Sequence, residues 1–316
     1  MDYIVLDLEW NQSNNGTEAE IKDMPFEIVE IGAVKLNADF EITDTFNRLI
    51  KPQVYREMNY ITKKLIHITM KDLESESFFP EVAHEFLQWC GSNSIFCTWG
   101  PLDLMELQRN MRHYGFSSLA EGPLKFYDVQ KLFSISFEDR KSRRTLEYAV
   151  DFLKMEKDIP FHRAFADAYY TAKVLCRLER SVFSNYSFDN FSAPKNKKEE
   201  VYAFFDSYMK YISREFENKQ EALSDREVKS TKCYLCGKNI RRKIKWFSLN
   251  GKHYYCVYHC SIHGNIKAKV RIRKSEDDKV YVVKTVKLIS QEEAENWKNK
   301  QERAKDQNRV KTWKKK

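Results

Sequence analysis

The order of strand-like and helix-like segments constrains the fold of this chain most strongly. Three segments with the alternating or β-branched pattern of strands come first, and their succession predicts an antiparallel meander. They are residues 3–8, 26–36 and 42–50. Helical patterns and short strands then alternate, as in parallel crossover connections. These later segments are residues 80–91, 94–99, 102–114, 125–129, 145–153 and 164–181. The sequence therefore predicts an α/β fold with a mixed sheet, in which antiparallel strands are followed by parallel ones.

The pattern changes after the last of these segments. Residues 184–198 are rich in Ser, Asn and Lys and contain one Pro, which is typical of a linker. Residues 199–223 carry aromatic side chains at helical spacing, which predicts an amphipathic helix. We therefore predict four parts. They are a first domain at residues 1–182, a linker with an amphipathic helix at 183–230, a small β-rich module at 231–289 and a basic, polar helical tail at 290–316.

Charge is distributed unevenly along the 316 residues, although the whole chain carries only +8. Residues 1–190 hold 22 basic and 30 acidic side chains, a net charge of −8, whereas residues 191–316 hold 32 and 16, a net charge of +16. An acidic part can hold metal ions and a strongly basic part can hold a polyanion. The alternative is a solvated charged face with a basic tail, and charge alone does not separate the two.

Two features indicate the compartment. No apolar run approaches the roughly 20 residues of a membrane helix, and the acidic start MDYIVLDLEW does not have the pattern of a secretory signal. We therefore expect a cytoplasmic protein without a membrane partner. Its oligomeric state is not readable from the sequence. The chain has seven cysteines, an odd number that argues against a disulfide framework in a reducing compartment.

Four of the cysteines lie between residues 233 and 260, which suggests a metal site. The pairs Cys233-x-x-Cys236 and Cys260-x-x-His263 are each followed by Gly, and together they form a tetrahedral ligand set for one structural Zn²⁺. The surrounding β-like segments predict a zinc-ribbon-like module. Three further residues compete for the same site. They are Cys256, His253 and His259, of which Cys256 and His259 have the spacing but lack the following Gly.

Two carboxylates, Asp7 and Glu9, lie at the end of the first predicted strand. Residues two apart on a strand point to the same face, so these side chains repel unless a cation lies between them. Mg²⁺ and Mn²⁺ are hard ions that prefer such oxygen ligands. Asp-x-Glu alone is weak evidence, because most such pairs are solvated surface charges.

The motifs that follow make the pair more specific. EIVEIGAVKL and FNRLIKP come next, then TWGPLD ending in Asp103, and finally PFHRAFADAYYTAKVL with His162 and Asp167. In this order they resemble the DEDDh exonucleases, the family of RNase T and of the proofreading subunit of bacterial replicative polymerase. The Trp99–Asp103 motif is most similar to the branch that trims RNA 3′ ends. The resemblance covers residues 3 to about 180.

This resemblance implies an RNase H-like fold with helices on both faces of the sheet. It implies hydrolysis of phosphodiester bonds at a 3′ end with two Mg²⁺ or Mn²⁺ ions, which clamp the attacking and leaving oxygens. Asp7, Glu9 and Asp167 would hold the ion near the nucleophile, Asp7 would bridge to the second ion and Asp103 would act largely through water. His162 would take the proton from the attacking water, a role that suits an imidazole near neutral pH.

The expected partner is single-stranded RNA or DNA, with RNA slightly favoured. We expect Leu8 and Trp10 to contact the terminal nucleotide. Alternating basic residues in the second half would bind the strand, since they share one strand face. These are Lys267, Lys269, Arg271 and Arg273. Two alternatives stay open: an accessory exonuclease for DNA proofreading or repair, and a non-catalytic adaptor that binds nucleic acid or protein.

Overall fold

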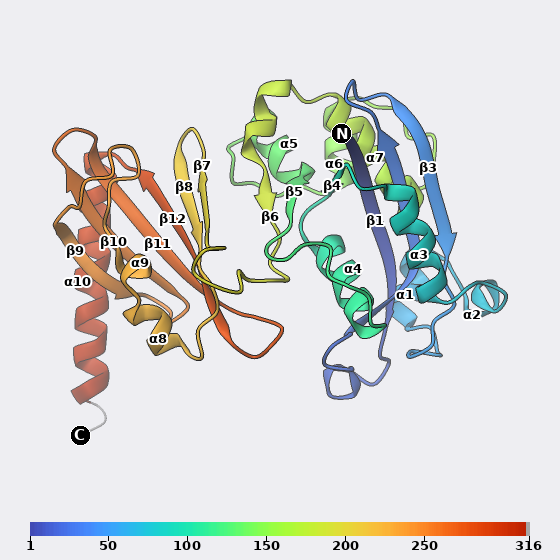
Figure 1. The fold of residues 1–316 in the computed structure, drawn as a ribbon, viewed down its shortest axis with the longest axis horizontal. Helices are drawn as coiled ribbons and strands as arrows, with labels where there is room; N and C mark the ends of the chain where they lie inside the picture. Colours follow the sequence, from blue (N-terminus) through green and yellow to red (C-terminus); the bar gives the residue numbers. More distant parts are fainter. Residues whose placement is uncertain (314–316) are drawn as a thin grey trace. The chain divides into compact units, whose positions relative to one another are not determined.

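The computed structural model of the chain describes residues 1–313, which divide into two compact units (Figure 1). The first is Met1–Phe191 and the second begins at Ser192. The boundary therefore lies nine residues beyond the predicted one at 182, because a short strand at Ser187–Phe188 still joins the first sheet. None of the described helices is long and apolar enough to cross a membrane.

The first unit is built on a six-stranded mixed sheet with the order β3-β2-β1-β4-β5-β6. Its strands are β1 (Asp2–Gln12), β2 (Phe26–Leu36), β3 (Ile42–Leu49), β4 (Ser94–Thr98), β5 (Lys125–Asp128) and β6 (Ser187–Phe188). The first three strands pair antiparallel, whereas β4 pairs parallel with β1 and β5 parallel with β4. This confirms the predicted succession of antiparallel and parallel strands.

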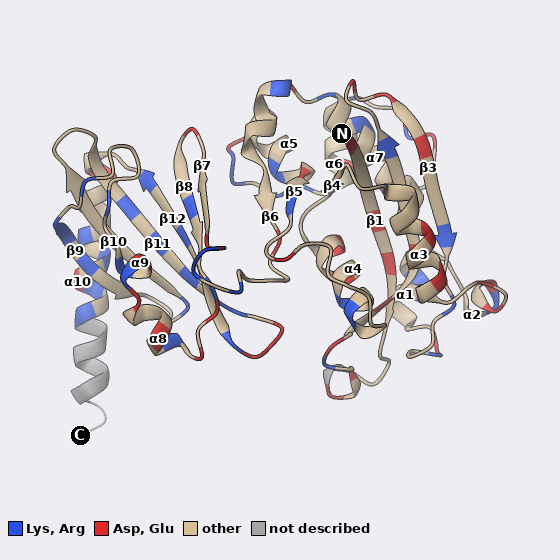
Figure 2. Ribbon diagram, in the orientation of Figure 1, with Lys and Arg blue, Asp and Glu red and all other residues tan. Residues whose placement is uncertain are grey.

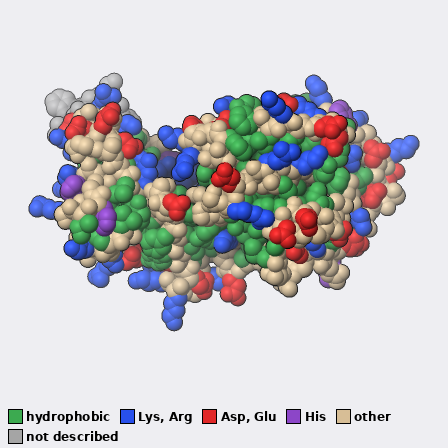
Figure 3. Space-filling model, turned by 90° about the horizontal axis from the view of Figure 1, so that it is seen from above, with side chains coloured by type: hydrophobic (Ala, Val, Ile, Leu, Met, Phe, Trp, Pro, Cys, Tyr) green, Lys and Arg blue, Asp and Glu red, His purple; other side chains and the backbone are tan. Residues whose placement is uncertain are grey.

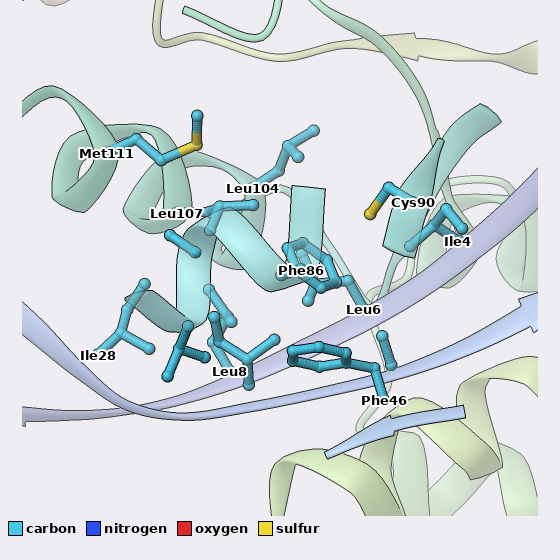
Figure 4. Close-up of a cluster of buried hydrophobic side chains, with 14 of the residues drawn as sticks. Ile4, Leu6, Leu8, Ile28, Phe46, Phe86, Cys90, Leu104, Leu107 and Met111 are labelled. Carbon is cyan, nitrogen blue, oxygen red and sulfur yellow. The ribbon is translucent and has the colours of Figure 1, made fainter. Parts of the chain in front are cut away.

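Helices cover both faces of this sheet, as predicted (Figure 1). They are α1 (Tyr60–Ile66), α2 (Met70–Leu73), α3 (Phe79–Cys90), α4 (Leu102–His113), α5 (Val129–Phe137), α6 (Leu146–Phe152) and α7 (Ala164–Cys176). Strand periodicity divides the side chains of β1 between two cores. Leu6 and Leu8 pack with α3 and α4 (Figure 4), whereas Val5 packs with α5, α6 and α7 on the other face.

The second unit is a six-stranded antiparallel sheet with the order β7-β8-β12-β11-β10-β9. Its strands are β7 (Val201–Phe204), β8 (Tyr208–Ile212), β9 (Arg242–Ser248), β10 (His253–Cys260), β11 (Gly264–Lys274) and β12 (Val280–Leu288). Its helices are α8 (Lys219–Ser224), α9 (Arg226–Lys229) and α10 (Gln291–Trp313). The predicted small β-rich module is therefore part of a larger sheet.

The amphipathic helix predicted at residues 199–223 is wrong. This segment forms the hairpin of β7 and β8, in which the backbone N–H of Phe205 donates to the carbonyl of Tyr208 across a two-residue turn. Aromatic residues favour strands, and here their helical spacing was coincidental because Tyr202 pairs with Tyr211 across the hairpin. Only Lys219–Ser224, near the end of the predicted range, is helical.

The predicted helix near the C-terminus is present as α10, but it is more than a polar tail. Ala294 and Trp297 pack against Ile244 of β9 and Val257 of β10, and Gln301 donates a hydrogen bond to the carbonyl of Lys245. A polar helix with one narrow apolar stripe is thus held on the sheet by that stripe. The last three residues of the predicted tail, 314–316, lie outside the described part of the chain.

Candidate active site

Asp7 and Glu9 lie within β1 and not at its end, since the strand continues to Gln12. A bulge falls directly after them, between Glu9 and Trp10, and bulges of this kind commonly re-aim side chains beside active sites. Across the antiparallel pair, Asp7 is opposite Gly32 and Glu9 is opposite Glu30 of β2. Paired residues share a face, so both carboxylates point to the side of the sheet that α7 covers.

Gly32 allows α7 to approach this point closely. A Cβ atom added at Gly32 would lie 2.1 Å from the carbonyl carbon of Ala164 and 2.1 Å from the nitrogen of Phe165. Because both atoms belong to the backbone, no side-chain rotation could relieve the clash. Because Gly32 has no side chain, the first turn of α7 can pack directly on β2, and this turn carries Asp167.

Three carboxylates meet at the site. Asp7, Glu9 and Asp167 each present an oxygen atom, and the three atoms lie within 4.8 Å of one another. Burial and repulsion from neighbouring acids raise the pKa of Glu9 to about 8, and the same causes raise the pKa of Asp7 well above its usual range. Buried Oδ1 of Asp167 has no hydrogen-bond partner among the described residues. A bound cation would reduce the repulsion between the carboxylates and would give the Asp167 oxygen a partner.

Asp103 comes from the other face of the sheet, in the first turn of α4. It is only 7% exposed, and burial raises its pKa to about 7 although backbone hydrogen bonds, one of them from Leu8, act in the opposite direction. It does not belong to the group of three close oxygens, yet its charge is the largest electrostatic contribution to the raised pKa of Asp7. Asp103 thus borders the cluster without joining its tightest part.

His162 lies just before α7 and is exposed. Its φ of 66° is left-handed, a conformation that residues other than glycine adopt uncommonly. Burial raises the pKa of Asp167 to about 6, and the nearby His162, through its charge and its backbone, partly offsets this effect. The structure therefore brings all five predicted residues to one region of the first unit.

Glu30 and Arg163 were not predicted, and they connect β2 to α7. The Glu30 side chain is fully buried and accepts two hydrogen bonds from Arg163, from Nε at 3.0 Å and from Nη2 at 2.8 Å. The backbone N–H of Ala164 donates to the same carboxylate at 3.3 Å. Bidentate pairing of this kind is strong and directional, so it fixes the start of α7 beside Glu9. A glutamate within the apolar run FEIVEIGAV was the available signal.

The prediction that the Leu8 side chain contacts a nucleotide is wrong, because this side chain is buried in the core. Leu8 is 3% exposed and packs in the core below the sheet with Ile28 and Leu107 (Figure 4). It lies between two residues that face the site, and strand alternation directs it away from them. Trp10 packs partly against the same core and lies 5.5 Å from the ring of Phe26, but it remains partly exposed. Its contact with substrate stays a prediction.

The second unit holds a separate cluster made of Cys233, Cys236, Cys260 and His263, whose ligand atoms lie within 4.8 Å of one another. The Sγ atoms of Cys236 and Cys260 are 3.8 Å apart, and Nδ1 of His263 lies 3.4 Å from Sγ of Cys233 and 3.6 Å from Sγ of Cys260. Tetrahedral Zn²⁺ with ordinary bond lengths places two sulfurs about 3.8 Å apart and a sulfur and a nitrogen about 3.6 Å apart. The donor set and its geometry therefore fit zinc.

The three competing residues are engaged elsewhere. Cys256 is buried in the core of the second unit, His259 contacts Asn265 at 3.0 Å and His253 contacts Asn250 at 3.2 Å. None of them belongs to the cluster found among the described residues. The two metal-binding pairs that are each followed by glycine in the sequence thus supply the four residues that the fold brings together.

Known proteins resemble the first unit. Residues 4–175 match the model of a family described as exonuclease (RNase T). The 3′-5′ exoribonuclease 1 of Rattus norvegicus is 24% identical over 189 residues, which covers 56% of this chain and 53% of that protein. The protein of the same name from Mus musculus is 23% identical with the same coverage. The chain spans about half the length of the curated relatives it matches.

Solved structures that match part of this chain include a full-length 3′-exonuclease, with 20% identity and a TM-score of 0.48 over 56% of this chain and 80% of that one. Another is the nuclease domain of 3′hExo, a DEDDh family member bound to rAMP, with 21% identity and a TM-score of 0.48 over 56% of this chain and 90% of that one. The family match spans more than half of the chain and includes each of the five acidic and histidine positions described above. The chain therefore belongs to the RNase T family of exonucleases.

Proposed function

We propose that the chain is a metal-dependent 3′→5′ exonuclease that acts on single-stranded nucleic acid and favours RNA. The observation that carries the proposal is the close approach of Asp7, Glu9 and Asp167, where a buried oxygen of Asp167 has no hydrogen-bond partner among the described residues. The preference for RNA is supported by the names of the matched relatives, which are 3′-5′ exoribonucleases. Cytoplasmic localisation, expected from the sequence, remains part of the proposal.

Each polar residue has a distinct part in this proposal. Two Mg²⁺ or Mn²⁺ ions, when bound, stabilise the charge that develops on the phosphate and lower the pKa of a bound water. Asp7, Glu9 and Asp167 would hold them, and Asp103, which is set back from the other three, would act through water. His162 is exposed and next to Asp167, so its imidazole can accept a proton from water and release it to solvent.

A competition experiment tests the substrate class. Linear RNA, linear DNA and circular RNA of the same sequence are incubated together with the purified chain and Mg²⁺. We expect linear RNA to disappear first, linear DNA more slowly, and circular RNA to persist because it has no 3′ end. Degradation of the circle would contradict exonuclease action, and faster loss of DNA would support the alternative of an accessory DNA exonuclease.

His162→Ala should lower the turnover rate by roughly a hundredfold or more, the usual effect of losing a general base. Substrate affinity should change little, because the imidazole is assigned to proton transfer and not to binding. Single-turnover degradation of a 5′-labelled RNA measures this rate. His84→Ala, which removes an exposed imidazole from α3, is the matched control and should retain full activity. An unchanged rate for His162→Ala would refute the proton-transfer role.

We also propose that the four-residue cluster of the second unit holds one structural Zn²⁺. Cys233 and Cys260 are buried and pack with Tyr258 and Ile266. The ion would therefore join the loop that carries Cys233 and Cys236 to the sheet. The other cores of this unit are separate groups, one formed by β8, β11 and β12 with α8 and α9, and one formed by β9 and β10 with α10. Zinc would therefore stabilise the end of the sheet beside this loop and would not take part in hydrolysis.

Cys260→Ser should reduce the zinc content from about one equivalent to near zero and lower the melting temperature of the chain, because binding to a structural site adds directly to folding stability. Metal analysis of the dialysed protein and a thermal melt measure both effects. Cys176→Ser, which alters an exposed thiol in the first unit, should change neither. Full zinc retention by Cys260→Ser would contradict the assigned ligand set.

A further inference from the structure

The second unit carries a row of cations on one face of its sheet. Lys267, Lys269, Arg271 and Arg273 alternate along β11 with Ile266, Ala268, Val270 and Ile272. The apolar members pack into the cores that also contain Cys233 and Val228, on the side of the zinc cluster, α8 and α9. Since side chains alternate between faces, all four cations point to the opposite side of the sheet. We call this side the basic face.

Neighbouring strands add to the basic face. In the antiparallel register, Lys267 is opposite Lys287 of β12, and Lys269 is opposite Thr285, which in turn is opposite Lys210 of β8. Residues paired in this way share a face, so the cations extend over three adjacent strands. Figure 2 shows the blue segments on β8, β11 and β12. The positive charge of the second unit is therefore concentrated by the fold and not merely by composition.

The four cations of β11 are poorly neutralised. Among the described side chains, Lys267, Lys269, Arg271 and Arg273 form no ion pair with a carboxylate, and Lys287 reaches Glu293 only at 4.0 Å. Burial and the nearby Lys287 lower the pKa of Lys267 to about 8. Nε of Arg273 is buried without a hydrogen-bond partner among the described residues. Like charges held together at a cost in solvation indicate a site for an anion.

Aromatic side chains border the cations along α10. Trp297 lies 4.4 Å from the ring of Tyr255 on β10, and Nζ of Lys267 lies 4.7 Å from the centroid of the Trp297 ring. The helix packs over β9 and β10, whereas Arg271 is exposed and Lys269 partly so. Alternate residues of a strand are about 6.7 Å apart, close to the spacing of neighbouring phosphates in an extended single strand. Cations at this spacing beside aromatic rings suit such a strand.

We infer that the basic face of the second unit binds the phosphate backbone of single-stranded nucleic acid. This inference rests on the proposed function, because the bound strand would be the substrate of the first unit. It locates binding on the β8–β12–β11 surface and not at the zinc cluster on the other side of the sheet. In contrast, Lys and Arg alternate with Asp and Glu on the part of the first unit seen in Figure 3, so this part presents no comparable concentration of positive charge.

The test compares two charge-matched double variants of the full chain. Lys269→Gln with Arg271→Gln removes two cations from the basic face. Arg226→Gln with Lys238→Gln removes two exposed cations from α9 and from the loop after Cys236, on the opposite side of the sheet. Binding of a fluorescent oligouridylate is measured by anisotropy over a range of salt concentrations, with chelator present so that no degradation occurs. Melting curves and zinc content verify folding, and Arg271→Gln alone provides a milder variant.

We expect the basic-face variant to bind on the order of tenfold more weakly, with a salt dependence shallower by about 1.4 log units per log unit, or about 0.7 for each lost phosphate contact. Arg271→Gln should show about half of this change in slope, and the opposite-side variant should match the unaltered chain. Equal affinity and slope for the basic-face variant, or a loss shared equally by both double variants, would overturn the inference.

Failure of the proposed function would look different. The unaltered chain is incubated in parallel with the same oligonucleotide and Mg²⁺. Absence of degradation, combined with weaker binding of the basic-face variant, would reject the exonuclease proposal and retain the basic face as a binding surface. Degradation by the unaltered chain, combined with unchanged binding of the variant, would do the reverse.

Discussion

Asp7→Asn should reduce degradation of single-stranded RNA at least about a thousandfold while the fold is retained. The substitution keeps the size of the side chain but removes one charge from the group formed with Glu9 and Asp167. Metal ions contribute several kcal/mol of transition-state stabilisation, and about 4 kcal/mol corresponds to a factor of roughly a thousand. The loss should therefore appear in the turnover rate, which single-turnover kinetics at saturating enzyme would measure.

The stability of the metal-free Asp7→Asn variant should not fall with its activity. Asp7 is surrounded by Asp103, Asp167 and Glu9, whose charges raise its pKa. Removing one of four mutually repelling acids relieves this repulsion, so the metal-free Asp7→Asn variant should melt no lower than the unaltered chain. Asp39→Asn, at an exposed position of the same unit, is the matched control for activity. A variant that degrades RNA at the normal rate would remove Asp7 from the active site.

Gly32→Ala should abolish activity and lower the free energy of unfolding by about 3 kcal/mol or more. A Cβ at this position would lie 2.1 Å from backbone atoms of Ala164 and Phe165, and overpacking of this kind costs up to about 3 kcal/mol even where side chains can move. Here the helix itself must shift. Since Asp167 lies in the first turn of α7, a displacement there would separate it from Asp7, which is opposite Gly32.

Thermal or denaturant unfolding and the RNA degradation rate measure the two effects of Gly32→Ala. Gly115→Ala is a matched control, because a Cβ at Gly115 meets nothing within 4 Å and the only penalty is its φ of +79°. It should cost about 1 kcal/mol and leave activity unchanged. If Gly32→Ala were as stable and as active as Gly115→Ala, the close approach of α7 to β2 would not be what positions Asp167.

The sequence was most informative where local pattern and packing agree. Residues 26–36, predicted as a strand, form β2 with the same bounds, and residues 102–114 correspond to α4 with a one-residue difference. The segment 199–223 failed because its aromatic residues fit two periodicities. What decides between them is a partner strand, β12, which lies some 70 residues further along the chain and pairs with β8. Local spacing contains no information about such a partner.

Some residues of the candidate site could be predicted from the sequence and others could not. The metal-binding residues and their order could be predicted, because Asp7, Glu9 and the Cys-x-x-Cys pair have chemical roles that few other residues supply. The ion pair between Glu30 and Arg163 could not be predicted, since the two residues are 133 positions apart and a glutamate within an apolar run does not reveal its partner. The burial of Leu8 follows from alternation along β1, which places it opposite to Asp7 and Glu9. Supporting residues thus depend on tertiary pairing, whereas the reactive groups are visible in the sequence.

A metal-dependent exonuclease centre at the carboxylate cluster of the first unit should cut RNA only when a divalent ion is present and only from a 3′ end. A 5′-labelled single-stranded RNA is incubated with the purified chain in chelator, then with Mg²⁺ restored, and the products are resolved at single-nucleotide spacing. This role of the carboxylate cluster predicts an intact substrate in chelator and, with Mg²⁺, a ladder of labelled products that shorten progressively from the 3′ end. Release of labelled mononucleotide from the 5′ end at the outset, degradation that persists in chelator, or no degradation with either Mg²⁺ or Mn²⁺ would contradict it.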